Sequence, residues 1–474
     1  MNKFIRKFNE ASPAVKASMV LLVSNLVLKG LSFISGPVFT RIMTTEQYGL
    51  ASNFNSWRDI FYVFVTLNLA SGVFNNGMLE FKNDRDRFQF SLIAITAILT
   101  GAFFVIFKVF QNQMASMMAL PNSLVYVMIL YYLTTPAFQF WSGRQRYEYK
   151  YKALACITIA SAVASMILGI AIVLIVPSDY SAISKITITE GINIVIGLFF
   201  ILYTGYKAGF KVNPEYCKYA LAFNIPLLPH YLSMYVLSSS DRIMITKMVN
   251  LSATAIYSVS YTVASVISIL WQSIDASLSP WIYEKLDRNE EVSVREVTGK
   301  VLLIFAAACL FCTLFAPEIM KVLAPEEYAS GIYVIPPVTA GVFFTAMYSV
   351  YMRVELFYKQ SGFATIATSI AALANIILNY VFIRLFGAVA AGYTTMVCYA
   401  LLALLHYINI KVKHYDSAFD NKRFLVIAII VVFATCFISL TYSLNWIRYA
   451  LIAVGIVTVI IKRNNIISAV RMKR

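Results

Sequence analysis

The sequence contains few charged residues, and this scarcity indicates which class of protein it is. Only 13% of the 474 residues are Asp, Glu, Lys or Arg, whereas 59% are hydrophobic. A soluble domain carries about 25% charged residues, so a soluble globular protein is excluded. Histidine is scarce as well, with three residues, His230, His406 and His414, that form no cluster in the sequence. Their spread argues against an enzyme that needs clustered histidines within the membrane.

Nucleotide-binding and metal-binding motifs are absent too. No GxxxxGK[ST] run occurs, and no polar segment is long enough for a nucleotide-binding domain, so direct pumping by ATP would need a partner. Six cysteines are scattered along the chain, and only Cys309 and Cys312 form a CxxC pair, inside an apolar run and without a second ligand pair. We therefore predict no metal site and no cofactor, and we interpret the cysteines as small core residues.

Long apolar runs are what the sequence has in abundance. They fit helices that cross a bilayer, whose core needs about 20 apolar residues, and their polar positions recur with the helical period. The sequence therefore predicts an all-α integral membrane protein of about fourteen transmembrane helices, not an outer-membrane barrel. The predicted spans cover residues 18–39, 48–69, 89–110, 123–141, 153–176, 183–206, 219–240, 252–274, 299–317, 331–352, 363–384, 389–410, 424–443 and 446–461.

The net charge of +16 follows from this topology. If the N-terminus is cytoplasmic, most Lys and Arg residues fall in segments on the cytoplasmic side, as the positive-inside rule requires. Both termini of this multi-pass protein are then cytoplasmic, and the lipid bilayer is its main partner. Basicity of this origin needs no nucleic acid to explain it.

Charged residues lie near the middle of the first two spans. At ~1.5 Å per residue, Lys29 lies about 16 Å into a bilayer core of roughly 30 Å, and Arg58 and Asp59 lie at similar depth. Asn25 shares a helix face with Lys29, and Asn55 shares one with Asp59. Because charge at this depth is costly unless it faces water or a partner, these faces predict a polar cavity. The alternative is an ion pair between Lys29 and Asp59 that only ties the helices together.

The seventh and eighth spans carry further polar stripes. Pro226 and Pro229 are expected to bend or interrupt the seventh span. Asp241 and Arg242 lie at its outer end, where snorkelling toward the headgroups explains them as well as a function does. The stripes contain Asn224, Tyr231 and Arg242 in the seventh span and Tyr257, Tyr261 and Gln272 in the eighth. In lipid such stripes must face the protein interior.

Four other polar residues of the predicted spans and their ends have expected roles of their own. Glu190, which shares its face of the sixth span with Asn193, is a candidate for binding a coupling ion. Asn375 and Asn379 in the eleventh span fit either interhelical hydrogen bonds or a pore lining. Glu355 lies at a cytoplasmic end, where we expect it to be solvated.

The chain also contains signs of an internal duplication. Arg-Ile-Met occurs at the end of the first span, from Arg41, and again at the end of the seventh, from Arg242. Copies offset by six spans share their orientation, as in transporters that alternate between inward-open and outward-open states. We therefore expect an N-terminal lobe at 1–206, a cytoplasmic linker at 207–218, a C-terminal lobe at 219–410 and two extra helices with a basic tail at 411–474. A central cavity is predicted between the lobes.

Several segments resemble a known family. They are GPVFTRIMTTEQYGLASNFNSW at 36–57, LNLASGVFNNG at 67–77, RQRYEYKYKAL at 144–154, NIPLLPHYLSMYVLSSSDRIMI at 224–245 and FGAVAAGYTT at 386–395. Through them the chain resembles the oligosaccharide flippases of the multidrug/oligosaccharidyl-lipid/polysaccharide exporter superfamily. The resemblance implies two six-helix lobes plus two C-terminal helices. It also implies transport of an undecaprenyl-diphosphate-linked O-antigen or capsular repeat unit from the cytoplasmic to the outer leaflet of a bacterial inner membrane.

The polar residues fit that substrate. A lipid-linked diphosphate calls for cations, which Lys29, Arg58 and Arg242 can supply. The sugars call for amides, hydroxyls and aromatic faces, which we expect from Asn25, Asn55, Asn224, Tyr231, Tyr257, Tyr261 and Gln272. Asp59 and Glu190 are the candidates for ion coupling, and the driving force stays open among protons, sodium and the membrane potential. Polysaccharide polymerase and glycosyltransferases are the expected protein partners.

Other functions on the same scaffold stay open. A multidrug exporter of the superfamily would want carboxylates in an apolar pocket, whereas the central charges are two cations, Lys29 and Arg58, to one acid, Asp59. A peptidoglycan-precursor (lipid II) flippase shares the chemistry and differs only in its glycan. A membrane enzyme would need large outward loops or a clustered pair of histidine and acid, and the sequence indicates neither.

Overall fold

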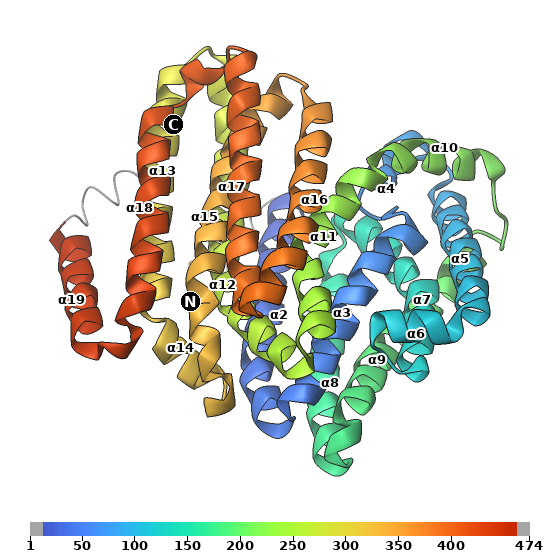
Figure 1. Ribbon diagram of the computed structural model, residues 1–474. Coiled ribbons are helices and arrows are strands. Elements are labelled where there is room, and N and C mark those ends of the chain that lie inside the picture. The colour runs from blue at the N-terminus through green and yellow to red at the C-terminus, as the bar shows by residue number, and fades with distance from the viewer. Residues whose placement is uncertain (1–12, 462–474) are drawn as a thin grey trace, which may run out of the picture. The chain divides into compact units, whose positions relative to one another are not determined.

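A computed structural model describes residues 13–461 of the chain. Within this range the chain forms eighteen α-helices and five short 3-10 helices and no β-strand (Figure 1). The basic residues between positions 3 and 7 and between 462 and 474, which the sequence assigns to the cytoplasm, lie outside the described residues.

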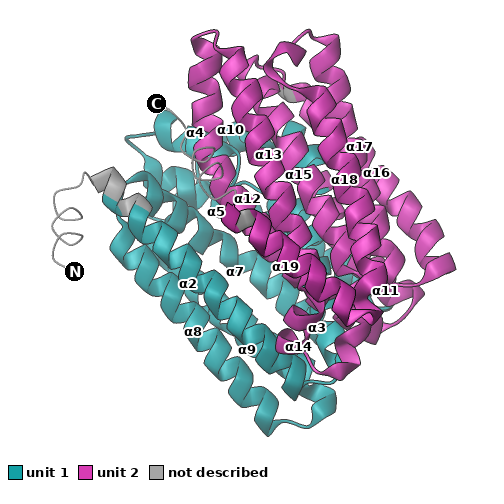
Figure 2. Ribbon diagram, turned by 90° about the vertical axis from the view of Figure 1, so that its left-hand side faces the viewer, with its two compact units in different colours: residues 1–232 teal, residues 233–474 magenta. Residues whose placement is uncertain are grey.

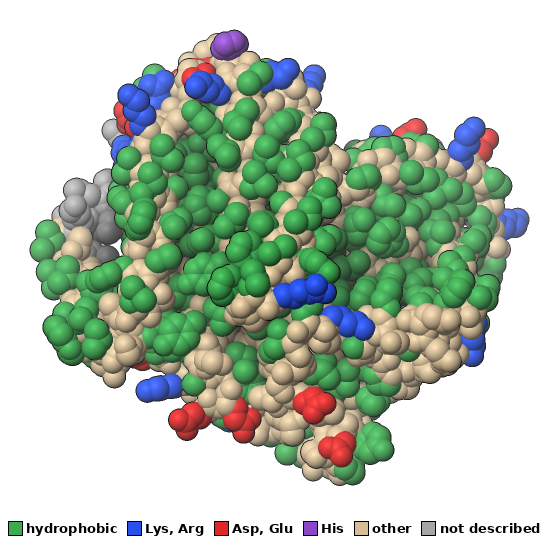
Figure 3. Space-filling view, viewed as in Figure 1, with side chains coloured by type: hydrophobic (Ala, Val, Ile, Leu, Met, Phe, Trp, Pro, Cys, Tyr) green, Lys and Arg blue, Asp and Glu red, His purple; other side chains and the backbone are tan. Residues whose placement is uncertain are grey.

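The prediction of an all-α membrane protein is confirmed. Among residues 13–461, twelve helical segments are long and apolar enough to cross a membrane, and Asn445–Thr458 is a shorter apolar helix. The predicted second span is a helix, α3 (Thr45–Thr66), but it is not among the twelve, because its charged and polar residues reduce its apolarity. Figure 3 shows apolar side chains along the helices of the C-terminal half and charged side chains gathered at the helix ends, as expected for helices that cross a membrane.

The chain divides into two compact units, residues 1–232 and 233–474 (Figure 2). The boundary falls inside α11 (Leu228–Met248). Unit 1 otherwise contains α2 (Pro13–Ile42), α3, α4 (Val73–Glu80), α5 (Arg85–Val109), α6 (Gln111–Met118), α7 (Asn122–Tyr147), α8 (Tyr151–Ile175), η1 (Ser178–Tyr180), α9 (Ser181–Lys207), α10 (Pro214–Asn224) and η2 (Ile225–Leu227).

Local sequence signals explain where the helices of unit 1 begin and end. Thr44 caps α3, because its hydroxyl accepts a hydrogen bond from the backbone N–H of Gln47 at 3.3 Å. Asn213 caps α10 in the same way, with Pro214 in the first turn. The seventh predicted span is interrupted as its two prolines indicate, since α10 ends at Asn224 and α11 begins at Leu228 after the short turn η2.

Five helices build the interior of unit 1. Helix α9 packs against both α7 and α8, α7 packs against α5, and α2 packs against α8. Figure 2 shows α2, α8 and α9 side by side. A core of aromatic and aliphatic side chains, among them Phe74, Phe88, Phe140 and Trp141, joins α4, α5 and α7. This packing holds α9 close to α3 and α7, where the polar cluster described below lies.

Unit 2 is organised around one buried helix, α15 (Ile335–Phe357). It packs against α12 (Leu251–Asp287), α13 (Glu291–Leu314), α17 (Val389–Val412) and α18 (Asn421–Leu440). Figure 1 shows α15, α17 and α18 side by side. The remaining elements are α14 (Ala316–Leu323), η3 (Glu326–Tyr333), α16 (Ser361–Phe386), η4 (Asp416–Ala418), η5 (Thr441–Ser443) and α19 (Asn445–Ile461). Because neighbours cover α15 on so many sides, its polar residues must find partners inside the protein.

The close contact between α7 and α9 depends on Gly197. A Cβ atom at this position would lie 2.5 Å from the carbonyl carbon and oxygen of Thr134, which no side-chain rotation can relieve. Gly197→Ala should therefore separate the helices and lower the midpoint of thermal unfolding by several degrees, since overpacking costs about 1–3 kcal/mol. The measurement is thermal unfolding of the detergent-solubilised protein.

Gly191→Ala on the same helix is the matched control. No atom lies within 4 Å of a Cβ built there, so this variant should unfold at or above the wild-type temperature, because Ala favours a helix over Gly. Equal midpoints for the two variants would contradict the assigned role of Gly197.

Candidate functional site

A cluster of charged residues links α3 to α9 inside unit 1. The Arg58 guanidinium donates from Nη1 to Glu190 Oε1, and from Nε and Nη2 to Asp59 Oδ1 at 3.1 and 2.9 Å. The Glu190 side chain is only 6% exposed, whereas that of Asp59 is 40% exposed. One cation is thus held between a buried carboxylate and an open one.

Side chains from α7 and α9 fix this arrangement. Tyr132 donates its hydroxyl to the backbone carbonyl of Arg58 at 2.8 Å, and the guanidinium lies 5.2 Å from the ring centre of Tyr131. Asn193, one turn after Glu190, donates to Glu190 Oε2 at 2.9 Å. Glu190 therefore has a partner on each oxygen, and Arg58 is held on its aromatic side as well as by charge.

The guanidinium still has capacity for another acceptor. It carries five N–H donors, and the contacts with Asp59 and Glu190 use three of them. An incoming anionic group can use the remaining donors or replace the exposed Asp59 carboxylate. The cluster is thus chemically suited to bind a phosphate group, and its two carboxylates are suited to bind a proton or a cation.

The other predicted residues of the first two spans do not join this cluster. Asn25 and Lys29 of α2 and Asn55 of α3 are exposed. Lys29 makes no ion pair or hydrogen bond with any described residue, and Asp59 pairs with Arg58 instead. The alternative of an ion pair between Lys29 and Asp59 is therefore not formed in this structure.

Two predicted residues of the seventh span belong to unit 1. Asn224 is fully buried, donates to the carbonyl of Leu67 at 2.7 Å and accepts from the N–H of Val73 at 2.9 Å. It thereby holds the turn between α3 and α4, and its amide is not open to a ligand here. Tyr231 is half-buried. Its hydroxyl lies close to Gly72, since a Cβ atom built at that glycine would be 2.9 Å from it.

Sequence reasoning missed a second polar region of unit 1. A hollow of about 250 Å³ between α2, α8 and α9 is lined by hydroxyl groups of Ser32, Ser35, Ser165 and Thr189, together with apolar side chains. Nearby, the ammonium group of Lys185 lies 3.8 Å from the ring centre of Phe39 and makes no ion pair with the described residues. Lys185 was not among the predicted site residues, because its aromatic neighbour Phe39 lies far from it in the sequence.

The structure corrects the position that the sequence predicted for Asp241, a residue of unit 2. Expected at a membrane surface, it is 1% exposed and accepts hydrogen bonds from Tyr257 at 2.5 Å, Asn379 at 2.6 Å and Thr395 at 2.7 Å. The helices α12, α16 and α17 supply these three donors and enclose the carboxylate. We expected Asp241 near a membrane surface because it lies at the end of the predicted seventh span. The neighbouring helices instead bury its side chain.

The network around Asp241 extends along α16. Asn379 also donates to Asn375 Oδ1 at 3.1 Å, and Ser240 donates to the same oxygen at 2.9 Å. Both asparagines are fully buried. Of the two interpretations that the sequence left open for Asn375 and Asn379, the structure shows interhelical hydrogen bonds.

Three of the remaining predicted residues of unit 2 lie next to one another, since the rings of Tyr257 and Tyr261 are 6.0 Å apart between centres and Arg242 contacts Tyr261. Arg242 stacks on Tyr261 with 4.6 Å between its guanidinium carbon and the ring centre, and it donates to the carbonyl of Ser238 at 2.8 Å. Gln272 is exposed. Tyr257 is fully buried and is committed to Asp241. Arg242 and Tyr261 thus form a pair, whereas Tyr257 supports the interior.

The expectation that Glu355 is solvated is wrong. This residue of α15 is fully buried and contacts His406 and Asn409 of α17. The sequence indicated no pair of histidine and acid, because 51 positions separate the two residues. Among the described residues, no group of three or more His, Cys, Asp or Glu side chains could hold a metal ion.

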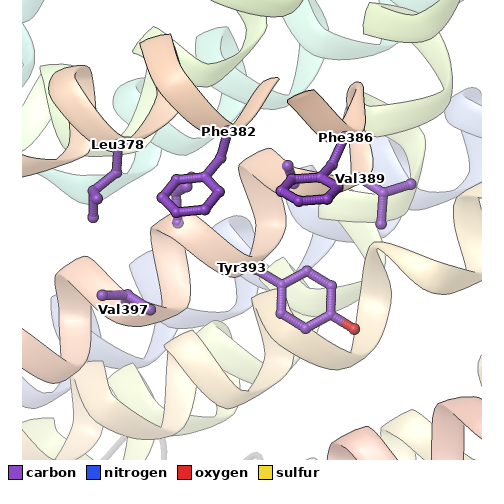
Figure 4. A pocket seen from close by; sticks show the side chains of 8 residues that line it. Leu378, Phe382, Phe386, Val389, Tyr393 and Val397 are labelled. Carbon is purple, nitrogen blue, oxygen red and sulfur yellow. The ribbon is translucent and has the colours of Figure 1, made fainter. Parts of the chain in front are cut away.

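A larger hollow in unit 2 has a different character. It measures about 520 Å³ and is lined by Leu378, Phe382, Phe386, Val389, Ala390, Tyr393, Thr394 and Val397 of α16 and α17. Figure 4 shows the rings of Phe382, Phe386 and Tyr393 around it. With an almost wholly apolar lining, it offers nothing to a diphosphate or a sugar, and we assign it no part in the polar site.

Comparisons with known proteins bear on the family and the fold. A family model described as polysaccharide biosynthesis protein matches residues 14–286. The probable low-salt glycan biosynthesis flippase Agl15 of Haloferax volcanii is 23% identical over 214 residues, which cover 44% of this chain and 43% of that protein. The chain therefore spans less than half the length of this curated relative.

Solved structures of transporters share the fold. The lipid II flippase MurJ in an inward closed conformation aligns over 95% of this chain and 100% of its own, with a TM-score of 0.66 and 15% identity. An inward-facing multidrug resistance MATE family transporter of the MOP superfamily aligns over 85% and 98%, with a TM-score of 0.61 and 12% identity. At these identities the likeness concerns the fold alone.

The resemblance seen in the sequence is thus confirmed for family and fold. The chain has the fold of MOP superfamily transporters, and the three proteins just described are a probable flippase, a flippase and a multidrug transporter, none of them an enzyme. Since the matched region covers more than half of its length, the chain belongs to the polysaccharide biosynthesis protein family.

Proposed function

We propose that this protein flips a lipid-linked oligosaccharide across a membrane. The proposed substrate is an undecaprenyl-diphosphate-linked repeat unit, moved from the cytoplasmic to the outer leaflet of a bacterial inner membrane for a surface polysaccharide such as O-antigen or capsule. The family description, polysaccharide biosynthesis protein, supports the pathway. The likeness to the Haloferax protein, a probable low-salt glycan biosynthesis flippase, supports the reaction.

The arrangement of Arg58 is the observation that carries the substrate class. Its guanidinium keeps two N–H donors free, and its second carboxylate partner, Asp59, is 40% exposed. A diphosphate carries compact negative charge and suits the planar, bidentate geometry of Arg. In the proposed complex it takes the place of Asp59, while Glu190 holds the guanidinium in position.

Further residues of the proposed site are the predicted polar residues whose side chains are exposed or half-buried. In unit 1 they are Lys29, Asn25 and Asn55, which are exposed, and the half-buried Tyr231. In unit 2 they are Arg242, Tyr261 and Gln272. We leave out Asn224 and Tyr257, whose polar groups are committed to internal hydrogen bonds.

The proposal includes the topology expected from the sequence. In it, α3 and α19 complete fourteen spans, both termini lie in the cytoplasm, and transport proceeds by alternating access between a lobe at 1–206 and a lobe at 219–410. The linker at 207–218 and the two helices and tail at 411–474 are part of the same expectation. The glycosyltransferases and the polymerase of the polysaccharide are the proposed partners.

One observation favours a second function, export of organic cations. The cluster in unit 1 contains two carboxylates, Asp59 and Glu190, for one guanidinium, Arg58. The count from the sequence, two cations to one acid, included Lys29, which lies outside the cluster, and omitted Glu190. A cluster with an excess of negative charge can attract a cationic drug as well as a proton.

Lys29→Ala tests the proposed anion site without disturbing the interior. Because Lys29 has no partner among the described residues, its removal leaves no charge unpaired. We expect flipping to fall about tenfold or more, since one charge-assisted hydrogen bond is worth about 1.5–3 kcal/mol. The measurement is transbilayer movement of fluorescent undecaprenyl diphosphate N-acetylglucosamine in proteoliposomes. Lys300→Ala, at an exposed ion pair with Glu296, should flip as the wild type does.

Arg58 needs a paired change, because Arg58→Ala alone would leave Glu190 buried without its cation. In Arg58→Gln/Glu190→Gln both charges are removed together and the chain should fold. We expect this variant to insert and purify normally and to lose flipping of the same probe. Undiminished flipping by both this variant and Lys29→Ala would rule out the anion site.

Asp59→Asn distinguishes the two candidate functions. The substitution removes a competitor for Arg58 and one negative charge, so it should strengthen binding of farnesyl diphosphate several-fold and weaken binding of tetraphenylphosphonium. Ligand-induced shifts in thermal unfolding measure both affinities. Tighter binding of the organic cation to the wild type than of the diphosphate would favour the exporter.

A further inference from the structure

A histidine and a carboxylate face each other inside unit 2. His406 Nδ1 lies 2.7 Å from Glu355 Oε2, and Asn409 donates to Glu355 Oε1 at 2.8 Å. The side chains of His406 and Glu355 are 0% and 1% exposed. His406 and Asn409 lie one turn apart on α17 and approach Glu355 near the end of α15.

Aromatic rings enclose the imidazole. Tyr348 of α15 stacks on it with 5.6 Å between ring centres and 18° between ring planes, and Phe363 of α16 meets it edge-on at 5.7 Å. Its second nitrogen, Nε2, is buried and has no hydrogen-bond partner in the described part of the chain. A native interior rarely leaves a buried polar atom unpaired, so this nitrogen calls for an explanation.

The charged neighbours of the pair have partners of their own or lie at helix ends. On α15, Arg353 forms an ion pair with Asp275 of α12 at 2.5 Å. None of the remaining charged groups on the helices that pack against α15 and α17 forms a hydrogen bond or ion pair with Glu355 or His406 in the described structure. They are Glu284, Lys285 and Asp287 of α12, Glu291, Arg295, Glu296 and Lys300 of α13, Arg384 of α16, Lys411 of α17, Lys422 and Arg423 of α18, and Glu326 and Glu327 of η3. The tyrosines on these elements include Tyr283, Tyr348, Tyr351, Tyr399 and Tyr407.

Elementary chemistry then fixes the state of each nitrogen. An ionised carboxylate only accepts hydrogen bonds, so with Glu355 ionised Nδ1 carries the proton that it donates to Oε2. Nε2 of the neutral ring is left with a lone pair. In that state the pair carries one negative charge in a dry interior, and one proton added at Nε2 makes it neutral.

We propose that Glu355 and His406 form a proton-binding site, and that protonation at His406 Nε2 couples a proton to transport. The inference rests on the proposed flippase function and names its driving ion. Of the other buried acids in the described structure, Glu190 is paired with the cation Arg58, and Asp241 accepts hydrogen bonds from three groups of which none is an imidazole. Rings seal the pair in this conformation, so a proton enters or leaves only when α15, α16 and α17 move, which links protonation to the transport cycle.

The protonation itself can be observed directly. The chain has three histidines, so the variant His230→Asn/His414→Asn keeps His406 as its only one. Nitrogen-15 NMR of labelled histidine in lipid nanodiscs, from about pH 5 to about pH 9, should show one reversible protonation of the ring. Glu355→Gln, close to isosteric, should leave the ring neutral over the same range. A ring that never titrates while the protein stays folded overturns the proposal.

Transport supplies the second readout. In proteoliposomes with fluorescent undecaprenyl diphosphate N-acetylglucosamine, a pH gradient should speed flipping by the wild type several-fold. Glu355→Gln and His406→Asn should lose this acceleration and still equilibrate the probe, whereas Lys29→Ala should lose both. Acceleration that persists in both pair variants overturns the coupling role. A wild type that never moves the probe, although His406 titrates, refutes the flippase function and leaves the proton site intact.

Discussion

The pairing of Arg58 with Glu190 is the constraint on which the interior of unit 1 depends. Water cannot compensate charge inside a bundle of membrane helices, so each buried ion must find its partner within the protein. Arg58 does so across α3 and α9, and Tyr132 of α7 contacts the backbone carbonyl of Arg58. Three helices are thereby held at one point, and the close approach of α7 and α9 at Gly197 lies two turns from it.

In the described part of unit 2, the buried carboxylates of Asp241 and Glu355 accept no hydrogen bond from an arginine or lysine. Asp241 is stabilised by a phenol, an amide and a hydroxyl, which together satisfy an ionised carboxylate. Glu355 has an amide and an imidazole instead. The difference matters because an imidazole can change its own charge, whereas the donors of Asp241 cannot in the ordinary range of pH. Two carboxylates at comparable burial thus differ in the chemistry of the groups that contact them.

The sequence predicted the helices well and the partners of their polar residues poorly. Length and apolarity established the helical membrane fold, and the prolines of the seventh span marked its interruption, because both are local properties. The sequence identified Glu190 as a candidate for ion binding because it shares a helix face with Asn193. It could not indicate the contact with Arg58, because the two residues are 132 positions apart. The burial of Glu355 and Asp241 was misjudged for the same reason. The position of a residue along one helix does not indicate which neighbouring helices cover its side chain. Two asparagines were local signals of these contacts. Asn193 lies three residues after the buried Glu190 and donates to it. Asn409 lies three residues after His406, and both contact Glu355.

Charge balance in the cluster of unit 1 bears most directly on the proposed substrate. With Asp59 and Glu190 ionised, Arg58 is already neutralised and one negative charge is left over, so an anion gains little from long-range attraction. It gains instead from geometry, because the guanidinium offers free donors beside an exposed carboxylate that can be displaced. Displacement would return Asp59 to water, where its charge is least costly. In the proposed complex, the same carboxylate that opposes an incoming diphosphate also lets it leave, since it can take back the guanidinium when the substrate departs.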